Sequence, residues 1–277
     1  SWVDASTLKD TSAYITMDAN APTYTKTESV WVPNGTKKIK LAMVGAHVVG
    51  STAGHPEMVW ATFEHTNNAP NLSYSYLDVS NKTKTVPADT GNGWLLNSDS
   101  ASNTYNQSHM TFSNDSIIAK TNENISASNT KMVNAWGVAN EGVPNPENES
   151  PAASNSQIIS TNNSVLGQLA DGDMRKNYIF IGATWTDSGA APNGDSYTAT
   201  NTTPGVAIGT SQLANSTMET YAQYGTDPFP GENASCFRCH STFQGAPGIK
   251  PTDLSHIYGA IQPLKYEKVE ESSSISN

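Results

Sequence analysis

The chain has 277 residues, a net charge of −10 and two cysteines. Its 15 Lys and Arg residues are scattered, which argues against nucleic-acid binding because phosphate recognition needs clustered basic side chains. Two cysteines in a chain of this length cannot form a disulfide-stapled scaffold. Charged residues make up 14% of the sequence, against roughly 25% in typical soluble proteins, and Asn, Ser, Thr and Gly take their place.

The start of the chain, Ser1-Trp2-Val3, carries no initiator Met. This start is consistent with a signal peptide that has been removed. No apolar run approaches the ~18 residues that a membrane-spanning helix requires. We therefore expect a mature exported protein, periplasmic or extracellular, with no membrane span.

The first half of the chain predicts short strands separated by polar turns. Alternating or β-branched residues favour strands at Lys38 to Val49, at Met58 to His65 and at Tyr74 to Val79. Pro33-Asn34-Gly35 and Gly91-Asn92-Gly93 are typical of turns.

The second half adds a few helices. Apolar residues from Ile158 to Leu169 have helical spacing and end at Asp171-Gly172-Asp173. Asn177 to Trp185 predicts a buried strand, whereas Gln212 to Gln223 and Thr252 to Ile261 predict two further helices. The sequence therefore favours a mainly β fold with a few short helices.

One motif carries recognisable chemistry: Cys236-Phe237-Arg238-Cys239-His240 has the C-x-x-C-H spacing of covalent c-type haem attachment. Two cysteines three residues apart lie about one helical turn from each other, so both sulfurs can form thioethers with the two vinyl groups of one haem. The adjacent His240 then lies beneath the iron and donates its imidazole as the proximal ligand.

Two other chemistries share part of this motif. A redox-active C-x-x-C pair sits at a helix start in a βαβ unit, and no such unit is visible in the sequence. A zinc site needs a second ligand pair, and the chain has no other Cys. The motif therefore predicts one covalent haem c.

On this basis the chain divides into three parts. Residues 1–225 form a β-rich body that contributes the distal side of the haem. Residues 226–264 form a haem-attachment segment, a loop or short helix near the C-terminus that packs on this body. The polar residues 265–277 form a disordered tail.

The sixth iron ligand is expected upstream of the motif, because no Met follows Met218. Three of the six histidines, His47, His55 and His65, fall close together on and between two predicted strands. Pro56 restricts His55 to an extended conformation. His47 lies between Gly45 and Gly50, where the backbone can approach a flat ligand closely. We favour His55, then His47, then His65.

Two alternatives to this ligand assignment stay open. His256 follows His240 by sixteen residues on the last predicted helix and could reach the iron, although a surface role suits it better. The three upstream histidines could also form a separate copper or zinc site, for which their spacing is loose.

The sequence also resembles a family. His47-Val48-Val49-Gly50, followed by the run from His55 to His65 (His-Pro-Glu-Met-Val-Trp-Ala-Thr-Phe-Glu-His), is similar to a motif of a largely uncharacterised family of exported bacterial mono-haem c-type cytochromes. Leu213 to Tyr221 before the C-x-x-C-H resembles the second hallmark of that family. The similar blocks span roughly residues 40 to 245. The resemblance implies a haem protein outside the cytoplasm and supports His47 and His55 as ligand candidates.

Three functions follow as hypotheses. The first is electron transfer through a bis-histidine haem, with the acidic chain docking on a basic redox partner protein. The second is a peroxidase-like haem enzyme in which an upstream His acts as acid and base, oriented by Glu57 or Glu64. The third is a surface or assembly subunit that carries haem and associates with itself. A haem-based sensor is a weaker possibility, because no output domain is visible.

Overall fold

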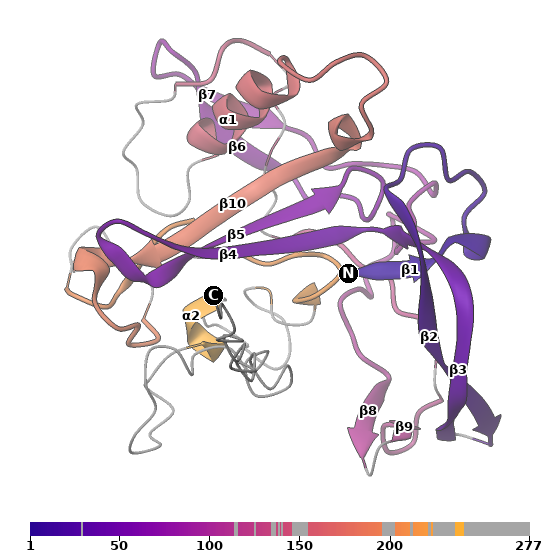
Figure 1. The fold of residues 1–277 in the computed structure, drawn as a ribbon. Helices are drawn as coiled ribbons and strands as arrows, with labels where there is room; N and C mark the ends of the chain where they lie inside the picture. The colour runs from indigo at the N-terminus through magenta and orange to yellow at the C-terminus, as the bar shows by residue number, and fades with distance from the viewer. Residues whose placement is uncertain are drawn as a thin grey trace, which may run out of the picture.

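A computed structural model describes residues 1–28, 30–113, 116–124, 126–133, 137, 139, 141–145, 155–195, 203–210, 213–220, 223 and 236–240. The strands are β1 (Trp2–Asp4), β2 (Thr16–Thr27), β3 (Val30–Met43), β4 (Gly45–Thr52), β5 (His55–His65), β6 (Tyr74–Leu77), β7 (Thr83–Val86), β8 (Met110–Ser113), β9 (Ser116–Ala119), β10 (Tyr178–Thr186) and β11 (Ala207–Gly209). The helices are α1 (Ser156–Leu166), α2 (Cys236–Cys239) and three 3₁₀ turns, Ala5–Thr7, Met174–Asn177 and Asp187–Gly189. The mainly β fold predicted from the sequence is confirmed (Figure 1).

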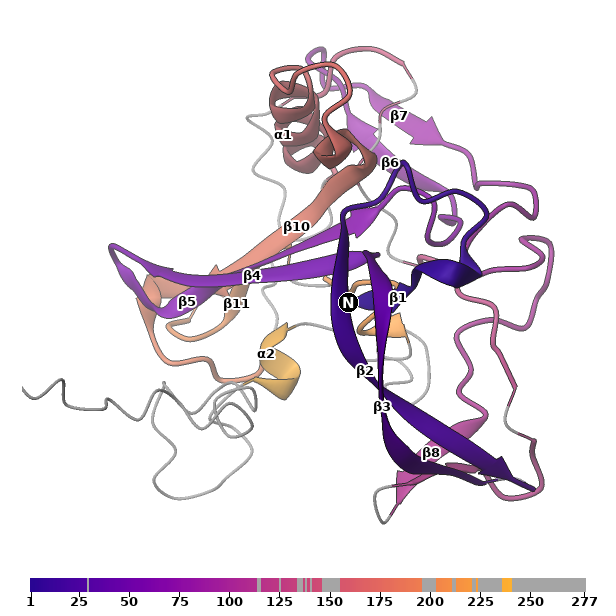
Figure 2. The same ribbon diagram turned by 45° about the vertical axis from the view of Figure 1, so that its right-hand side comes forward.

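The long antiparallel hairpin of β2 and β3 dominates the first sheet, whose order is β1-β3-β9-β8 with β2 on β3 (Figure 2). The turn predicted at Pro33-Asn34-Gly35 is wrong, because these residues lie inside β3. The pairing register shifts opposite them, between Thr23 and Tyr24, and Gly35 adopts a φ of 134° that favours glycine. Turn-forming residues here mark a bulge in a strand rather than its end.

The second sheet has the order β11-β10-β5-β4, with all neighbours antiparallel. The single strand predicted from Lys38 to Val49 is wrong in its extent, because the chain leaves β3 and enters β4 at Val44. The Val44 backbone N–H donates to the carbonyl of Ser1 at 3.0 Å, and its own carbonyl accepts from the backbone N–H of His65 at 3.0 Å. Val44 is therefore the residue at which the chain changes sheets.

The strand predicted from Met58 to His65 is confirmed and extends back to His55 as β5. Met58 has a φ of 77°, and β5 has two more residues than β4 between the Gly50–Val59 and Thr52–His55 pairs. The strand predicted from Asn177 to Trp185 corresponds to β10, and the one from Tyr74 to Val79 to β6.

The pairing of β4, β5 and β10 gives the second sheet two different faces. The seat face carries His47, Val49, Trp60, Thr62 and Glu64, with His47 opposite Thr62 and Val49 opposite Trp60. The aromatic face carries Phe63, His65, Tyr178 and Phe180, with Phe63 opposite Phe180 and His65 opposite Tyr178. Rings meet across both pairs, at 5.5 Å and 5.1 Å between centroids.

Helix α1 confirms the helical spacing seen from Ile158 onward. Its buried Ile158 packs with Met132, Ile181 and Leu213 in one apolar cluster. The helix predicted from Gln212 to Gln223 is wrong for residues 213–219, which are irregular or form turns, and Thr220 is in a 3₁₀ conformation. The helix predicted from Thr252 to Ile261 and the tail at 265–277 lie outside the described residues.

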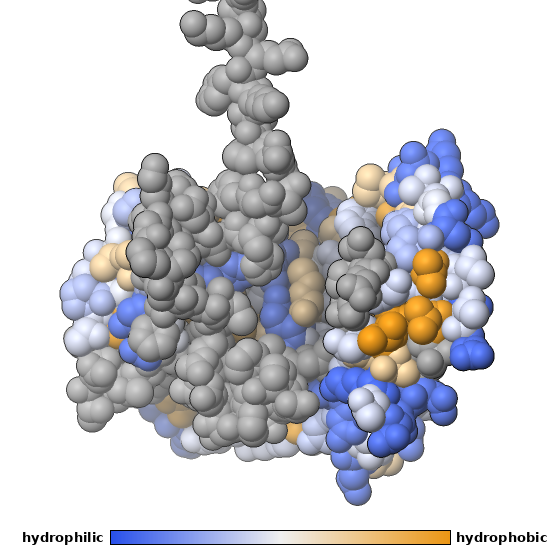
Figure 3. All heavy atoms as spheres, turned by 90° about the horizontal axis from the view of Figure 1, so that it is seen from below, coloured by the Kyte–Doolittle hydropathy of each residue, from blue (hydrophilic) through white to orange (hydrophobic). Residues whose placement is uncertain are grey.

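Viewed from below, the described surface is largely hydrophilic, with one confined hydrophobic group toward the right (Figure 3). This agrees with the abundance of Asn, Ser and Thr in the sequence. Among the helices of the described residues, none has the length and hydropathy to cross a membrane.

Candidate haem-attachment site

Helix α2, which contains the C-x-x-C pair, rests against strand β5. Phe237 is fully buried and forms an apolar cluster with Trp60 and Ala207, to which Met58 and Cys236 add partly buried contacts. The rings of Trp60 and Phe237 meet edge to face, with centroids 6.0 Å apart and planes at 76°, an arrangement that aromatic pairs favour. The short helix is therefore anchored through the one apolar residue between its two cysteines.

His240 follows α2 and lies on the same side of the sheet. Its backbone N–H donates to the carbonyl of Cys236 at 3.0 Å, which brings the histidine one turn below the first cysteine. Its ring lies against Trp60, with centroids 4.4 Å apart and planes at 34°. Phe237 and His240 thus both contact Trp60.

Trp60 itself has an unmet hydrogen-bonding group. The residue is 5% exposed, and its indole Nε1 has no hydrogen-bond partner among the residues that the structure describes. Thr184 of β10 pairs with Trp60, and its hydroxyl donates to the carbonyl of Ile208 at 2.7 Å. A buried donor without an acceptor costs about 1–3 kcal/mol of stability. The apolar contacts around α2 therefore include one unsatisfied N–H donor.

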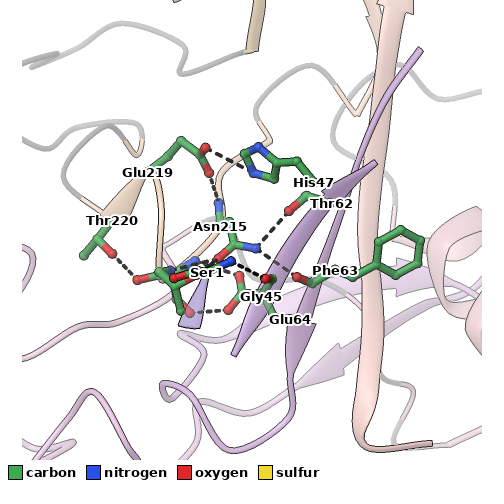
Figure 4. Close-up of polar contacts among 11 residues, drawn as sticks. Ser1, Gly45, His47, Thr62, Phe63, Glu64, Asn215, Glu219 and Thr220 are labelled. Atoms are coloured by element: carbon green, nitrogen blue, oxygen red, sulfur yellow. Dashed lines mark hydrogen bonds and ion pairs between the residues drawn. The ribbon is translucent and has the colours of Figure 1, made fainter. Parts of the chain in front are cut away.

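His47 lies on the seat face, near the start of β4. Its Nε2 is 3.1 Å from Oε1 of Glu219, and both side chains are about one-third exposed or less. Glu219 Oε2 accepts from the backbone N–H of Asn215 at 2.7 Å, so the carboxylate joins β4 to the turn at 213–220 (Figure 4). In this arrangement the Nε2 nitrogen of His47 is already engaged.

The turn at 213–220 is built on the seat face by buried polar groups (Figure 4). Asn215 donates from Nδ2 to Thr62 Oγ1 at 2.9 Å and to the carbonyl of Phe63 at 3.0 Å. Gly45 leaves the space, since a Cβ there would lie 2.7 Å from Thr217 Oγ1. The close approach expected at this glycine is therefore to residues 215–217 of the chain itself, whereas Gly50 has open space beside it.

Glu64 is the buried acid of this face. Its Oε1 accepts from the backbone N–H of Ser216 at 2.7 Å, and its Oε2 accepts from the Ser216 hydroxyl. Burial raises the pKa of Glu64 to about 7, against the opposing effect of the Ser216 hydrogen bonds. The sequence proposed Glu64 only as an orienting group for a histidine; its partner is Ser216, which lies 152 positions away in the sequence.

His55 lies at the other end of the hairpin and on the other face. The register pairs it with Thr52, and its ring meets Trp185 edge-on at 6.4 Å. Its Nδ1 is 2.8 Å from Oε1 of Glu57, a carboxylate only 1% exposed. A carboxylate bonded to one imidazole nitrogen fixes the tautomer and leaves the lone pair on the other, as in many metal-ligating histidines.

Glu57 is held firmly for this role. Its Oε1 also accepts from the backbone N–H of Thr186 at 3.1 Å, while its Oε2 has no partner among the described residues. Burial acts to raise the pKa of Glu57, but the hydrogen bonds from His55 and Thr186 outweigh it and hold that pKa below its usual range. The charged carboxylate therefore persists beside His55 at neutral pH.

His65, the third candidate, has a structural environment. It is 2% exposed and stacks on Tyr14 at 3.9 Å. Its Nε2 lies 3.1 Å from the carbonyl of Ala13, and its Nδ1 accepts from the backbone N–H of Asn67 at 3.1 Å. With both nitrogens engaged in the aromatic face, His65 has none left for a metal.

The upstream histidines are thus dispersed rather than gathered. His47 lies on the seat face, whereas His55 and His65 lie on the aromatic face, and no cluster of three metal-binding side chains occurs within the described ranges. This geometry removes the support for a three-histidine copper or zinc site. His256 lies outside the described residues.

Comparisons with protein-family models, with curated proteins and with solved structures return no match. The resemblance to exported mono-haem cytochromes therefore stays a prediction from the motifs.

Proposed function

We propose that the chain is an exported c-type cytochrome that carries one haem, bound covalently through Cys236 and Cys239 with His240 as the proximal iron ligand. The observation that carries this proposal is the seating of α2: Phe237 is buried against Trp60, and the ring of His240 lies on the same tryptophan. A C-x-x-C-H motif in a loose surface segment would have no such anchor. Here the motif is bound to the rigid β5 strand.

The residues around the motif suit a haem. Trp60, Phe237 and Ala207 form a buried apolar cluster at the motif, and the indole N–H of Trp60 is a donor without a partner among the described residues. When bound, haem supplies one-electron redox chemistry at its iron. The protein supplies the proximal ligand, the apolar seat and the control of access to the iron.

We assign the sixth iron ligand to the β4–β5 hairpin, with His55 and His47 as the two candidates. His55 has the better donor chemistry, because Glu57 takes its Nδ1 and leaves its Nε2 lone pair available, but it lies on the aromatic face, across the sheet from Trp60. His47 has the better position, because it shares the seat face with Trp60, although Glu219 engages its Nε2. Either histidine gives the bis-histidine iron of an electron carrier, and neither requires a Met.

Electron transfer is the function that this arrangement supports best. Two histidine ligands leave the iron no open position for substrate and favour a low reduction potential. The net charge of −10 suits docking on a basic surface of a redox partner, an attraction that salt weakens. We place the protein outside the cytoplasm, in the periplasm or beyond.

A peroxidase-like enzyme is the second candidate, and the His55–Glu57 pair favours it. A histidine whose Nδ1 is 2.8 Å from a buried carboxylate can act as an acid and base on the distal side of a haem. In that case the ferric iron would be high-spin and would bind cyanide rapidly. Electron transfer predicts a low-spin ferric spectrum and no turnover of peroxide.

The test is expression in a bacterial host that attaches haem c outside the cytoplasm. We expect a protein whose mass includes one haem after denaturation. The double substitution Cys236→Ser and Cys239→Ser should lose it, whereas Arg238→Lys keeps the motif and should retain it. A purified wild-type chain of full length without covalent haem would refute the proposal.

A further inference from the structure

We propose that Trp60 is a haem-binding residue whose indole N–H donates a hydrogen bond to a propionate of the haem. This inference rests on the proposed function, since it needs a haem attached at Cys236 and Cys239. It goes beyond that function by assigning a polar contact to a residue that would otherwise count only as part of the apolar core.

The first observation is the unmet donor. Trp60 is 5% exposed, and its Nε1 has no acceptor in the part of the chain that the structure describes. Its cross-strand neighbours do not provide one: Val49 is apolar, and the Thr184 hydroxyl donates to Ile208. Buried Trp N–H groups normally find a partner, so the acceptor is expected outside the described residues, and we assign it to the haem.

The second observation is the location of this donor. The Trp60 ring contacts both Phe237 and His240, which flank Cys239 in the attachment motif. A haem attached at this motif and bound by His240 would therefore lie beside Trp60. The strong hydrogen-bond acceptors of such a haem are its two propionates, because thioether sulfurs accept only weakly. An N–H donor to a carboxylate makes a charge-assisted bond, stronger than a neutral one.

A second tryptophan provides a matched control. Trp31 also has a buried Nε1 without a partner among the described residues, but it lies on β3 in the other sheet. Its ring faces Lys26, whose Nζ is 5.8 Å from the ring centroid. Trp31→Phe therefore removes the same chemical group at a place remote from the motif in the fold.

The experiment compares the Trp60→Phe and Trp31→Phe holoproteins by mass, midpoint potential and the pH dependence of that potential. Loss of the N–H leaves the propionate charge less neutralised, which favours the ferric state and raises the propionate pKa. We expect Trp60→Phe to keep its haem and to lower the reduction equilibrium constant about three- to tenfold, tenfold being about 59 mV for one electron. The pH range over which the midpoint potential changes should also move to higher pH. Trp31→Phe should change neither the midpoint potential nor this pH range.

A measurement on the unmodified protein covers the case in which Trp60→Phe does not fold. In the reduced, diamagnetic holoprotein labelled with ¹⁵N-indole, the Trp60 N–H signal should exchange slowly and shift as the propionate titrates. A fast-exchanging signal that does not titrate, or an unchanged potential in Trp60→Phe with haem attached, would overturn the inference while leaving the proposed function intact. A wild-type chain without covalent haem would overturn both.

Discussion

The two faces of the β4–β5–β10 sheet use the same strands for different purposes. On the aromatic face, both ring nitrogens of His65 have hydrogen-bond partners, which are the carbonyl of Ala13 and the backbone N–H of Asn67. On the seat face, Trp60 has an unmet N–H and Glu64 has a raised pKa. The comparison teaches that burial alone does not identify a functional histidine or tryptophan. A functional histidine or tryptophan is identified by polar atoms that the fold leaves without hydrogen-bond partners.

The largest effect is expected at the anchor of α2. Phe237→Ala removes a fully buried ring from its contact with Trp60, which should lower the free energy of unfolding by about 4 kcal/mol, within the range for such truncations. Denaturant titration of the holoprotein measures this change. The matched variant Val165→Ala, on the exposed side of α1, should cost far less. Equal losses would show that α2 is not seated on β5.

The next effect is a pH dependence from Glu64. Its pKa rises from the ordinary 4.5 to about 7 in the fold, so its stabilising contribution is fully present below pH 4.5 and is lost as pH rises through about 7. By linkage this amounts to about 3 kcal/mol. Glu64→Gln should remove the loss of stability that accompanies ionisation of Glu64 as pH rises, and it should leave the variant the more stable protein above pH 7.

Unfolding free energies measured from pH 4 to 8 check this expectation. The exposed Glu28→Gln serves as the control and should leave the slope unchanged. A wild-type slope that persists in Glu64→Gln would mean that another buried group on the seat face titrates in this range.

His65 sharpens the contrast from the aromatic side. His65→Ala removes the stack on Tyr14 and leaves the backbone N–H of Asn67 without its acceptor, whereas the carbonyl of Ala13 keeps its bond from Asn177 Nδ2, so the change should cost about 2 kcal/mol of stability. Burial lowers the pKa of His65, so wild-type stability should also fall as pH drops below about 6.5. The visible spectrum of the haem should stay unchanged, whereas a changed iron spin state would return His65 to the ligand candidates.

The smallest expected effect concerns the partly exposed pair of Glu219 and His47. Glu219→Gln should change the free energy of unfolding by less than about 1 kcal/mol, because such ion pairs contribute little. Added salt should reduce the difference further. A loss well above this value would indicate that Glu219 holds the turn at 213–220 chiefly through the backbone N–H of Asn215.

The sequence was sufficient for the parts of this account that depend on local spacing. The C-x-x-C-H motif, the mainly β fold, strand β10 and helix α1 follow from residues near one another in the chain. The roles of the histidines do not, because they depend on register and on remote partners. Ala13 engages His65 across 52 positions, and Ser216 engages Glu64 across 152.

Two errors share a physical cause. Gln212 to Gln223 has helical spacing, yet Asn215 and Ser216 bond to Thr62 and Glu64, and residues 213–219 are irregular or form turns. The run from Lys38 to Val49 has the pattern of one strand, yet it is divided between two sheets at Val44. In both cases tertiary hydrogen bonds outweigh a local preference.

We propose that one haem c is attached beside Trp60 and that a histidine of the β4–β5 hairpin is the sixth iron ligand. The most direct test is the visible and near-infrared spectrum of the oxidised and reduced holoprotein, with His55→Ala and His47→Ala alongside. We expect a low-spin ferric spectrum that becomes high-spin in one of these two variants only. A near-infrared Met–iron band, or a low-spin spectrum unchanged in both variants, would contradict it.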